Sequence, residues 1–154
     1  MKWWLGFLPA LWLACGIQAV VGATGTTLVQ LPLLVLATFS VFGSRTQAIL
    51  AGILCGVIEG GVVGSNLGAF VLTRLIVALL ASGIEPDEMD LRGPFAFIWG
   101  LGFTLAALVL FRLGVPWADF GLFALVTMSC ALLNGILAIP AFAAARKFLA
   151  LPRR

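Results

Sequence analysis

The chain has 154 residues, of which 62% are hydrophobic and only 10% are charged, and its mean hydropathy is +1.18. Soluble globular domains are about half apolar and about a quarter charged, so the composition excludes that class and indicates an integral membrane protein. The formal net charge is +3, and five of the nine basic residues lie near the chain ends. This distribution favours anchoring at an anionic membrane surface, and it gives no indication of nucleic-acid binding.

Six apolar runs divide the chain at glycine, proline and charged residues. At roughly 20 residues per crossing, the length predicts an all-α fold, a polytopic membrane bundle of about six transmembrane helices. We place the spans at residues 3–21, 26–42, 46–63, 67–82, 94–115 and 120–145, within a single membrane domain covering 1–154. The first run resembles a signal peptide, but we expect an uncleaved span. Trp3 and Trp4 are expected to anchor it at the membrane interface.

The second span is the least regular of the six. Residues 27–43 form a short apolar run that contains Pro32. A short, proline-containing segment crosses a bilayer only if it is tilted, broken or shielded by neighbouring helices. We therefore expect one of these three arrangements.

The positions of the basic residues predict the orientation. With six spans and an inward N-terminus, Arg112 is the only basic residue near an outer end, and the cytoplasmic segments hold Lys2, Arg45, Arg92, Arg146, Lys147, Arg153 and Arg154. The positive-inside rule then favours both termini in the cytoplasm. The one polar loop, from Ser82 to Pro94, is predicted to be a solvated cytoplasmic loop, although its acids Glu85, Asp87, Glu88 and Asp90 leave its role open.

Glycine recurs every four residues at positions 52, 56, 60, 64 and 68. One helix from Thr46 to Ser82 would be about 55 Å long, well beyond a hydrocarbon core of roughly 30 Å, so the chain must reverse. The sequence favours a turn between Gly60 and Asn66, with Ser65 or Asn66 capping the returning helix. Gly52, Gly56 and Gly60 would then let another helix pack closely. Gly64 and Gly68 would permit the reversal and a tight crossing.

Those glycines have two interpretations: they allow close packing within the bundle, or they form a dedicated interface with a partner.

Glu59 and Arg74 lie on opposite sides of the predicted turn, at depths that a long arginine can bridge. An unpaired charge there would cost at least about 2.5 kcal/mol, so we expect the two to pair. The pair either locks the hairpin or contacts a partner or ligand.

Other polar residues are sparse within the spans. Gln18, Thr127, Ser129 and Asn134 are candidates for hydrogen bonds between helices, worth about 0.6 kcal/mol each. The sequence has no His and no paired intramembrane carboxylates, which argues against an enzyme, and its three cysteines lack metal-ligand spacing. We expect no catalytic residues, cofactor or metal.

Two segments of the chain resemble the family of the rod shape-determining protein MreD. They are FGSRTQAILAGILCGVIEGGVVGSNLGAFVLTRLIV, from Phe42 to Val77, and LLNGILAIPAFAAARKF, from Leu132 to Phe148. The first resembles a short second span, a glycine-rich third helix ending in an acidic residue, and a Gly-Asn/Leu-Gly start to the fourth. The match covers Glu59, Gly60, Gly64, Asn66 and Gly68. Arg74 is added from the physics of pairing, not from the family.

The resemblance implies a non-catalytic protein of the bacterial inner membrane that supports peptidoglycan synthesis and rod shape. It implies binding to MreC, a single-span protein, in a complex with the glycosyltransferase RodA, a class B penicillin-binding protein and the MreB filament. It also implies a fold similar to the substrate-binding subunits of energy-coupling-factor transporters. A vitamin-binding transporter subunit therefore stays open as the alternative, as do a homodimer and bound membrane lipids.

Overall fold

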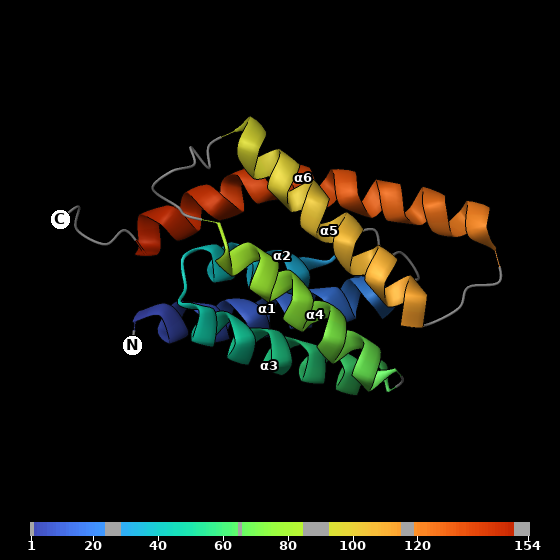
Figure 1. The fold of residues 1–154 in the computed structure, drawn as a ribbon, viewed down its shortest axis with the longest axis horizontal. Coiled ribbons are helices and arrows are strands. Elements are labelled where there is room, and N and C mark those ends of the chain that lie inside the picture. Colours follow the sequence, from blue (N-terminus) through green and yellow to red (C-terminus); the bar gives the residue numbers. More distant parts are fainter. Residues whose placement is uncertain (1, 24–28, 65, 85–92, 115–118, 150–154) are drawn as a thin grey trace.

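The computed structural model describes residues 2–23, 29–64, 66–84, 93–114 and 119–149, and within these ranges every regular element is a helix. In chain order they are α1 (Lys2–Ala23), α2 (Leu31–Val41), α3 (Arg45–Val63), α4 (Leu67–Ser82), α5 (Pro94–Gly114) and α6 (Phe120–Leu149), shown in Figure 1. Four of them, α1, α3, α5 and α6, are long and apolar enough to cross a membrane, whereas α2 and α4 are shorter. The predicted all-helical fold is confirmed, and four of the six predicted spans correspond to helices long enough to cross a membrane.

The predicted boundaries hold within a few residues except at two places. The first is α2, which begins at Leu31 rather than at residue 26, although residues 26–28 lie outside the described ranges. Gln30 has a non-helical backbone, and proline occupies the first turn, where its missing N–H costs no helical hydrogen bond. The second is α6, which continues to Leu149. The acidic residues from 85 to 90 also lie outside the described ranges.

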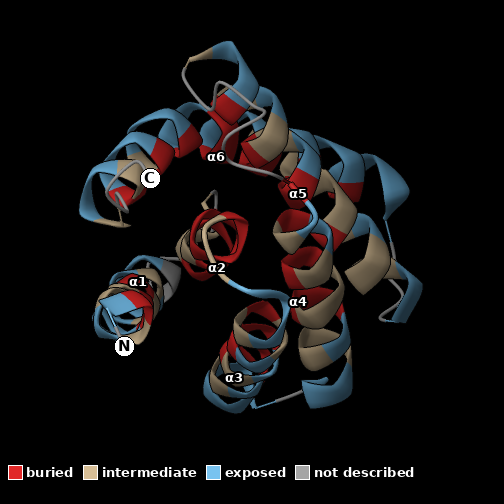
Figure 2. Cartoon of the chain, turned by 60° about the vertical axis from the view of Figure 1, so that its left-hand side comes forward, coloured by how far each residue is buried: buried red, intermediate tan, exposed pale blue. Residues whose placement is uncertain are grey.

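Helix α2 is the centre of the bundle. It has 11 residues, which makes it about 16 Å long, roughly half of a hydrocarbon core. Nine of those residues are buried, and Figure 2 shows α2 with the other helices around it. Of the three arrangements expected for this segment, shielding by neighbouring helices is the one observed. Because α2 is short, its first backbone N–H groups lie inside the protein and require acceptors from other helices.

Helix α1 packs with one face only. Phe7, Leu11 and Ala14 point inward and are buried, whereas the opposite side carries exposed apolar side chains. Trp3 is also buried, and its indole N–H donates to the carbonyl oxygen of Phe39 at 2.8 Å. The prediction that Trp3 is an interfacial anchor is therefore wrong. The indole N–H supplies a hydrogen-bond donor to a carbonyl in the last turn of α2. Without it, that carbonyl would need a donor from the membrane interface.

Candidate functional site

The candidate site is an ion pair enclosed between α3 and α4. Arg74 donates from Nε to Oε2 of Glu59, and from Nη2 to Oε1 of Glu59 at 3.1 Å. Both side chains are buried. Two parallel bonds between a guanidinium and a carboxylate fix orientation as well as neutralising both charges. The pairing predicted from the sequence is present.

The hairpin geometry brings these two residues together. Glu59 lies about 6 Å before the end of α3, and Arg74 lies about 10 Å after the start of α4. The longer arginine side chain covers that difference in depth. Arg74 also lies 5.7 Å from the centre of the Phe70 ring, one turn earlier on α4. The guanidinium is thus held by a carboxylate and by an aromatic ring of its own helix.

Glycines allow α3 and α4 to approach each other closely. A Cβ placed on Gly52 would lie 2.9 Å from the Cα of Leu75, and one on Gly56 would lie 2.4 Å from the Cα of Val71. On Gly60 it would lie 3.0 Å from the Cα of Leu67. Positions four apart on α3 therefore meet positions four apart on α4, in antiparallel order. The helix for which these glycines make room is α4, so within the bundle they serve the hairpin.

The turn itself differs in part from the prediction. Gly64 has a φ of 71° and supplies the reversal, and Asn66 has a φ of 56°. Asn66 occupies the position before α4 but makes no side-chain capping bond to its first turn, and Ser65 lies outside the described residues. A Cβ on Gly68 would meet nothing within 4 Å. The expectation that Gly68 is needed for a tight crossing is therefore wrong, because Gly68 is exposed and its neighbour Leu67 is the residue that contacts α3.

Gln30, which the sequence analysis did not identify, extends the ion pair toward the rest of the bundle. Its side-chain Oε1 accepts from Nη2 of Arg74 at 3.3 Å. Its backbone N–H donates to Oδ1 of Asn134 at 3.2 Å, and its carbonyl accepts from Nδ2 of Asn134 at 3.4 Å. The amide of Asn134 thus pairs with both backbone groups of one residue. A non-helical residue inside a membrane bundle requires such a partner.

Two further helices join this network. Nδ2 of Asn134 donates to Oγ1 of Thr104 on α5 at 3.0 Å, and Oε1 of Gln18 on α1 accepts from the backbone N–H of Leu31 at 2.8 Å. The expected hydrogen bonds between elements are therefore observed for Gln18 and Asn134. Neither Thr127 nor Ser129 makes one to another described helix. The polar network of Gln18, Gln30, Glu59, Arg74, Thr104 and Asn134 connects α1, the start of α2, α3, α4, α5 and α6.

Cys55 borders the ion pair, one turn before Glu59. Its Sγ lies 3.7 Å from Oε2 of Glu59 and 3.9 Å from the carbonyl oxygen of Pro32, distances at which a thiol can donate weakly to either. All three cysteines are free, and the described residues contain no cluster of His, Cys, Asp and Glu that could hold a metal ion. The polar groups of the network bond mainly to one another. The network therefore provides hydrogen-bond partners for the non-helical backbone just before α2 and holds the surrounding helices together.

Replacing Asn134 by alanine is expected to destabilise the protein by about 1–3 kcal/mol. The part-buried backbone N–H of Gln30 loses its acceptor, and the Gln30 carbonyl keeps only the bond from the backbone N–H of Leu34. Unfolding of the detergent-solubilised protein would measure the change. Ile136→Ala is the control, since Ile136 is on the same helix but 57% exposed. Equal destabilisation by the two variants would mean that the Asn134 bonds carry no net stability.

Comparisons with protein-family models, curated proteins and solved structures return no match for this chain.

Proposed function

We propose that the protein is a non-catalytic inner-membrane component of the bacterial cell-elongation machinery, similar to MreD, that binds the transmembrane helix of an MreC-type partner. Through that partner it would act with RodA, a class B penicillin-binding protein and MreB in peptidoglycan synthesis. The observation that carries the proposal is the convergence of the two segments that resemble this family. Glu59 and Arg74 come from the first segment, Asn134 comes from the second, and Gln30 bonds to both.

The use of the polar residues also supports a scaffold. Side chains that could bind a polar vitamin or assist catalysis are engaged with each other in the network, and Asn134 is fully buried. The outer faces of α1 and α6 are instead lined by exposed apolar side chains, which suit contact with other membrane helices. A rigid bundle with apolar outer faces favours a partner-binding role over a ligand-binding role.

The charge distribution supports an orientation with both termini of the chain on the cytoplasmic side. Lys2 begins α1, Arg45 begins α3, and Arg146 and Lys147 lie in the last turn of α6. Figure 1 places the start of α1 and the end of α6 on the same side of the bundle. Arg112, at the end of α5, lies at the opposite end. Most basic residues of the described helices therefore gather at one membrane face, as the positive-inside rule requires of the cytoplasmic side.

Co-purification from membranes tests the proposal. The tagged full chain, co-expressed with a candidate MreC, is expected to retain it through detergent extraction. The matched control is the same MreC with its transmembrane helix replaced by one from an unrelated single-span protein, which should be lost. Failure to recover MreC, together with a small molecule bound tightly to the purified protein, would favour the transporter-subunit alternative.

A further inference from the structure

The polar network has more hydrogen-bond donors than acceptors. Each of its side-chain oxygens accepts at least one hydrogen bond from a described residue. Of its nitrogens, Nδ2 of Asn134 donates to two oxygens, and Nε and Nη2 of Arg74 donate to Glu59 and Gln30. Three nitrogens have no acceptor within the described part of the chain: Nε2 of Gln18, Nε2 of Gln30 and Nη1 of Arg74. Each of them carries two N–H groups.

The three free nitrogens lie close together at the start of α2. Nε2 and Oε1 of Gln30 share one carbon atom, as do Nη1 and Nη2 of Arg74, and Oε1 lies 3.3 Å from Nη2. Oε1 of Gln18 accepts from the backbone N–H of Leu31, the residue after Gln30. Because both glutamine amides face a donor, the atom on that side is the oxygen, and Nε2 is the free end of each amide. Gln18, Gln30 and Arg74 are called the donor cluster below.

The donor cluster lies within the bundle but is not sealed. The side chain of Arg74 is 3% exposed, and Gln18 and Gln30 are partly buried. Among the described residues, the buried side-chain N and O atoms that have neither a partner nor accessible surface are Oγ1 of Thr38 and Oγ of Ser40. Nη1 of Arg74 is not one of these atoms, so part of its surface stays open to a ligand.

The position of the cluster along the helices makes its free N–H groups costly. Gln18 lies about 8 Å before the end of α1, and Arg74 lies about 10 Å after the start of α4. In the proposed orientation both of these helix ends are at the outer membrane face. The cluster is then in the outer part of the hydrocarbon core, just below the level of the phospholipid esters. A free N–H there costs free energy unless it meets an acceptor.

The chemistry of the cluster selects an uncharged group with oxygen acceptors. A cation does not fit, because all the free groups are donors. An anion does not fit either, because Glu59 already balances the charge of Arg74 and the charge of the anion would stay uncompensated in hydrocarbon. A carbonyl oxygen is neutral and accepts two hydrogen bonds. A phospholipid presents two such oxygens in its ester linkages.

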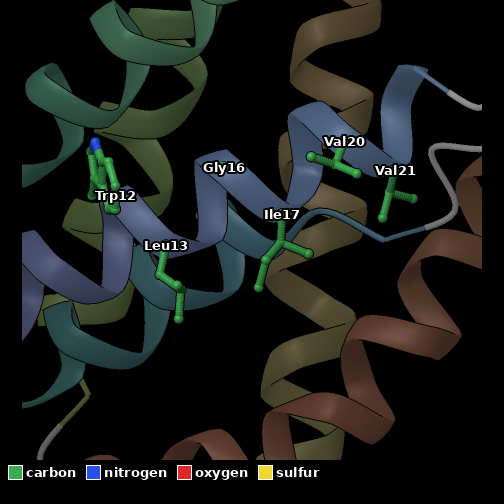
Figure 3. A pocket seen from close by; sticks show the side chains of 6 residues that line it. All are labelled: Trp12, Leu13, Gly16, Ile17, Val20 and Val21. Carbon is green, nitrogen blue, oxygen red and sulfur yellow. The ribbon is translucent and has the colours of Figure 1, made fainter.

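The hollow on the outward face of α1 lacks this chemistry. Figure 3 shows the side chains that line it, and the indole N–H of Trp12 is their only hydrogen-bonding group. The lining residues are Trp12, Leu13, Gly16, Ile17, Val20 and Val21. A lipid chain against that hollow contacts carbon atoms, so its binding does not depend on ester oxygens.

We infer that the donor cluster binds the ester carbonyl oxygens of one phospholipid, which completes the polar network at the start of α2. The carbonyl oxygens accept from the free N–H groups of Gln18, Gln30 and Arg74. The lipid is thus a structural component of the bundle. This inference goes beyond the proposed function, because the site involves no MreC-type partner.

Binding of matched ester and ether lipids tests the site. The full chain is stripped of co-purified lipid in detergent and titrated with dioleoylphosphatidylcholine or with its diether analogue, which lacks both carbonyl oxygens. Native mass spectrometry counts the bound lipid. The headgroup has no net charge, so the basic residues at the other end of the bundle add no preference. One ester lipid is expected to bind about tenfold more tightly than the ether lipid, as two neutral hydrogen bonds would give. Equal affinities would overturn the inference.

A matched pair of substitutions assigns the preference to the cluster. Gln30→Glu keeps an oxygen for Nη2 of Arg74 but replaces the free N–H groups by a carboxylate oxygen, and it is expected to abolish the preference for the ester lipid. Gln47→Glu is the control. The side chain of Gln47 accepts from the backbone N–H of Ser44 at the start of α3, a role that glutamate also fulfils, so this variant should keep the tenfold preference.

The remaining outcomes are equally decisive. An undiminished ester preference in Gln30→Glu would show that the carbonyl oxygens bind elsewhere. A tightly retained molecule other than a lipid, found by mass spectrometry of the purified chain and displaced by Gln30→Glu, would assign the cluster to a soluble ligand instead. The comparison of the two lipids on the unaltered chain needs no variant, so it decides the question even if Gln30→Glu does not fold.

Discussion

Replacing Arg74 by leucine is expected to destabilise the protein by about 3–5 kcal/mol. The variant removes one partner of a buried ion pair, and the carboxylate of Glu59 is left without its two hydrogen-bond donors in a site closed to water. Thermal unfolding of the purified protein in detergent, together with the unfolding free energy in mixed micelles, would measure the loss. Arg112→Leu is the control, because Arg112 lies at the end of α5, beside the Phe123 ring, and should matter much less.

A double-mutant cycle distinguishes a direct interaction between Glu59 and Arg74 from two independent effects on stability. Glu59→Gln leaves the charge of Arg74 unpaired and should also destabilise, but Glu59→Gln with Arg74→Leu removes both charges. The double variant is expected to recover a coupling energy of at least about 2 kcal/mol relative to the sum of the single changes. Additive effects would show that the two residues do not depend on each other for stability.

Gly56→Ala is expected to destabilise the protein strongly although it adds a single methyl group. The new Cβ would lie 2.4 Å from the Cα and 2.7 Å from the backbone N of Val71. Backbone atoms cannot rotate away, so α3 and α4 must separate. Overpacking costs about 1–3 kcal/mol and occasionally more, which outweighs the gain of about 1 kcal/mol in helix propensity. We expect net destabilisation near the upper end of that range, measured by unfolding in detergent.

Gly61→Ala is the matched control for Gly56→Ala. Gly61 lies on the same helix, and a Cβ there would meet nothing within 4 Å. The substitution should be neutral, or stabilising by up to about 1 kcal/mol, because it gains helix propensity without a clash. If the two variants unfold at the same point, close backbone approach at Gly56 is not a determinant of hairpin stability.

Arg74→Leu and Gly56→Ala disturb the same part of the molecule by different routes. Loss of the ion pair leaves a charge in the polar network, and Gly56→Ala forces apart the helices that hold Glu59 and Arg74 within reach. Gln30 bonds to Arg74, so either change is transmitted to the start of α2. We therefore expect α2, the central helix, to lose order first in both variants, which hydrogen exchange of its amides would report.

The helices and the hairpin were predictable because membrane thickness limits the length of each apolar run. The limit of about 30 Å located the reversal between α3 and α4, and insertion energetics predicted that Glu59 and Arg74 would pair. The boundaries of α2 were less predictable. Hydropathy records how apolar a segment is, but the beginning of a helix inside a bundle depends on which groups satisfy its first N–H donors.

The polar network shows what the sequence left undecided. Gln18 and Asn134 were candidates for bonds between helices, but their partners were unknown, and Gln30 was overlooked beside an apolar run. The signal was the proline at 32, since an interrupted backbone inside a membrane needs nearby side-chain acceptors and donors. The side chains that provide these hydrogen bonds can lie more than 100 positions away in the chain, as Asn134 does from Gln30, so only the tertiary contacts identify them.

The sequence by itself determined that this is a helical membrane protein, where the α3–α4 hairpin turns and which two charges meet. Each follows from a local quantity, the transfer free energy of apolar residues and the cost of an unpaired charge. Only the tertiary structure decided that Gly52, Gly56 and Gly60 face α4, that Trp3 is buried and that Trp12 points outward. All six helices are apolar nearly all round, so the periodicity of their sequences does not show which face points inward. Close packing between helix backbones determines the inward face.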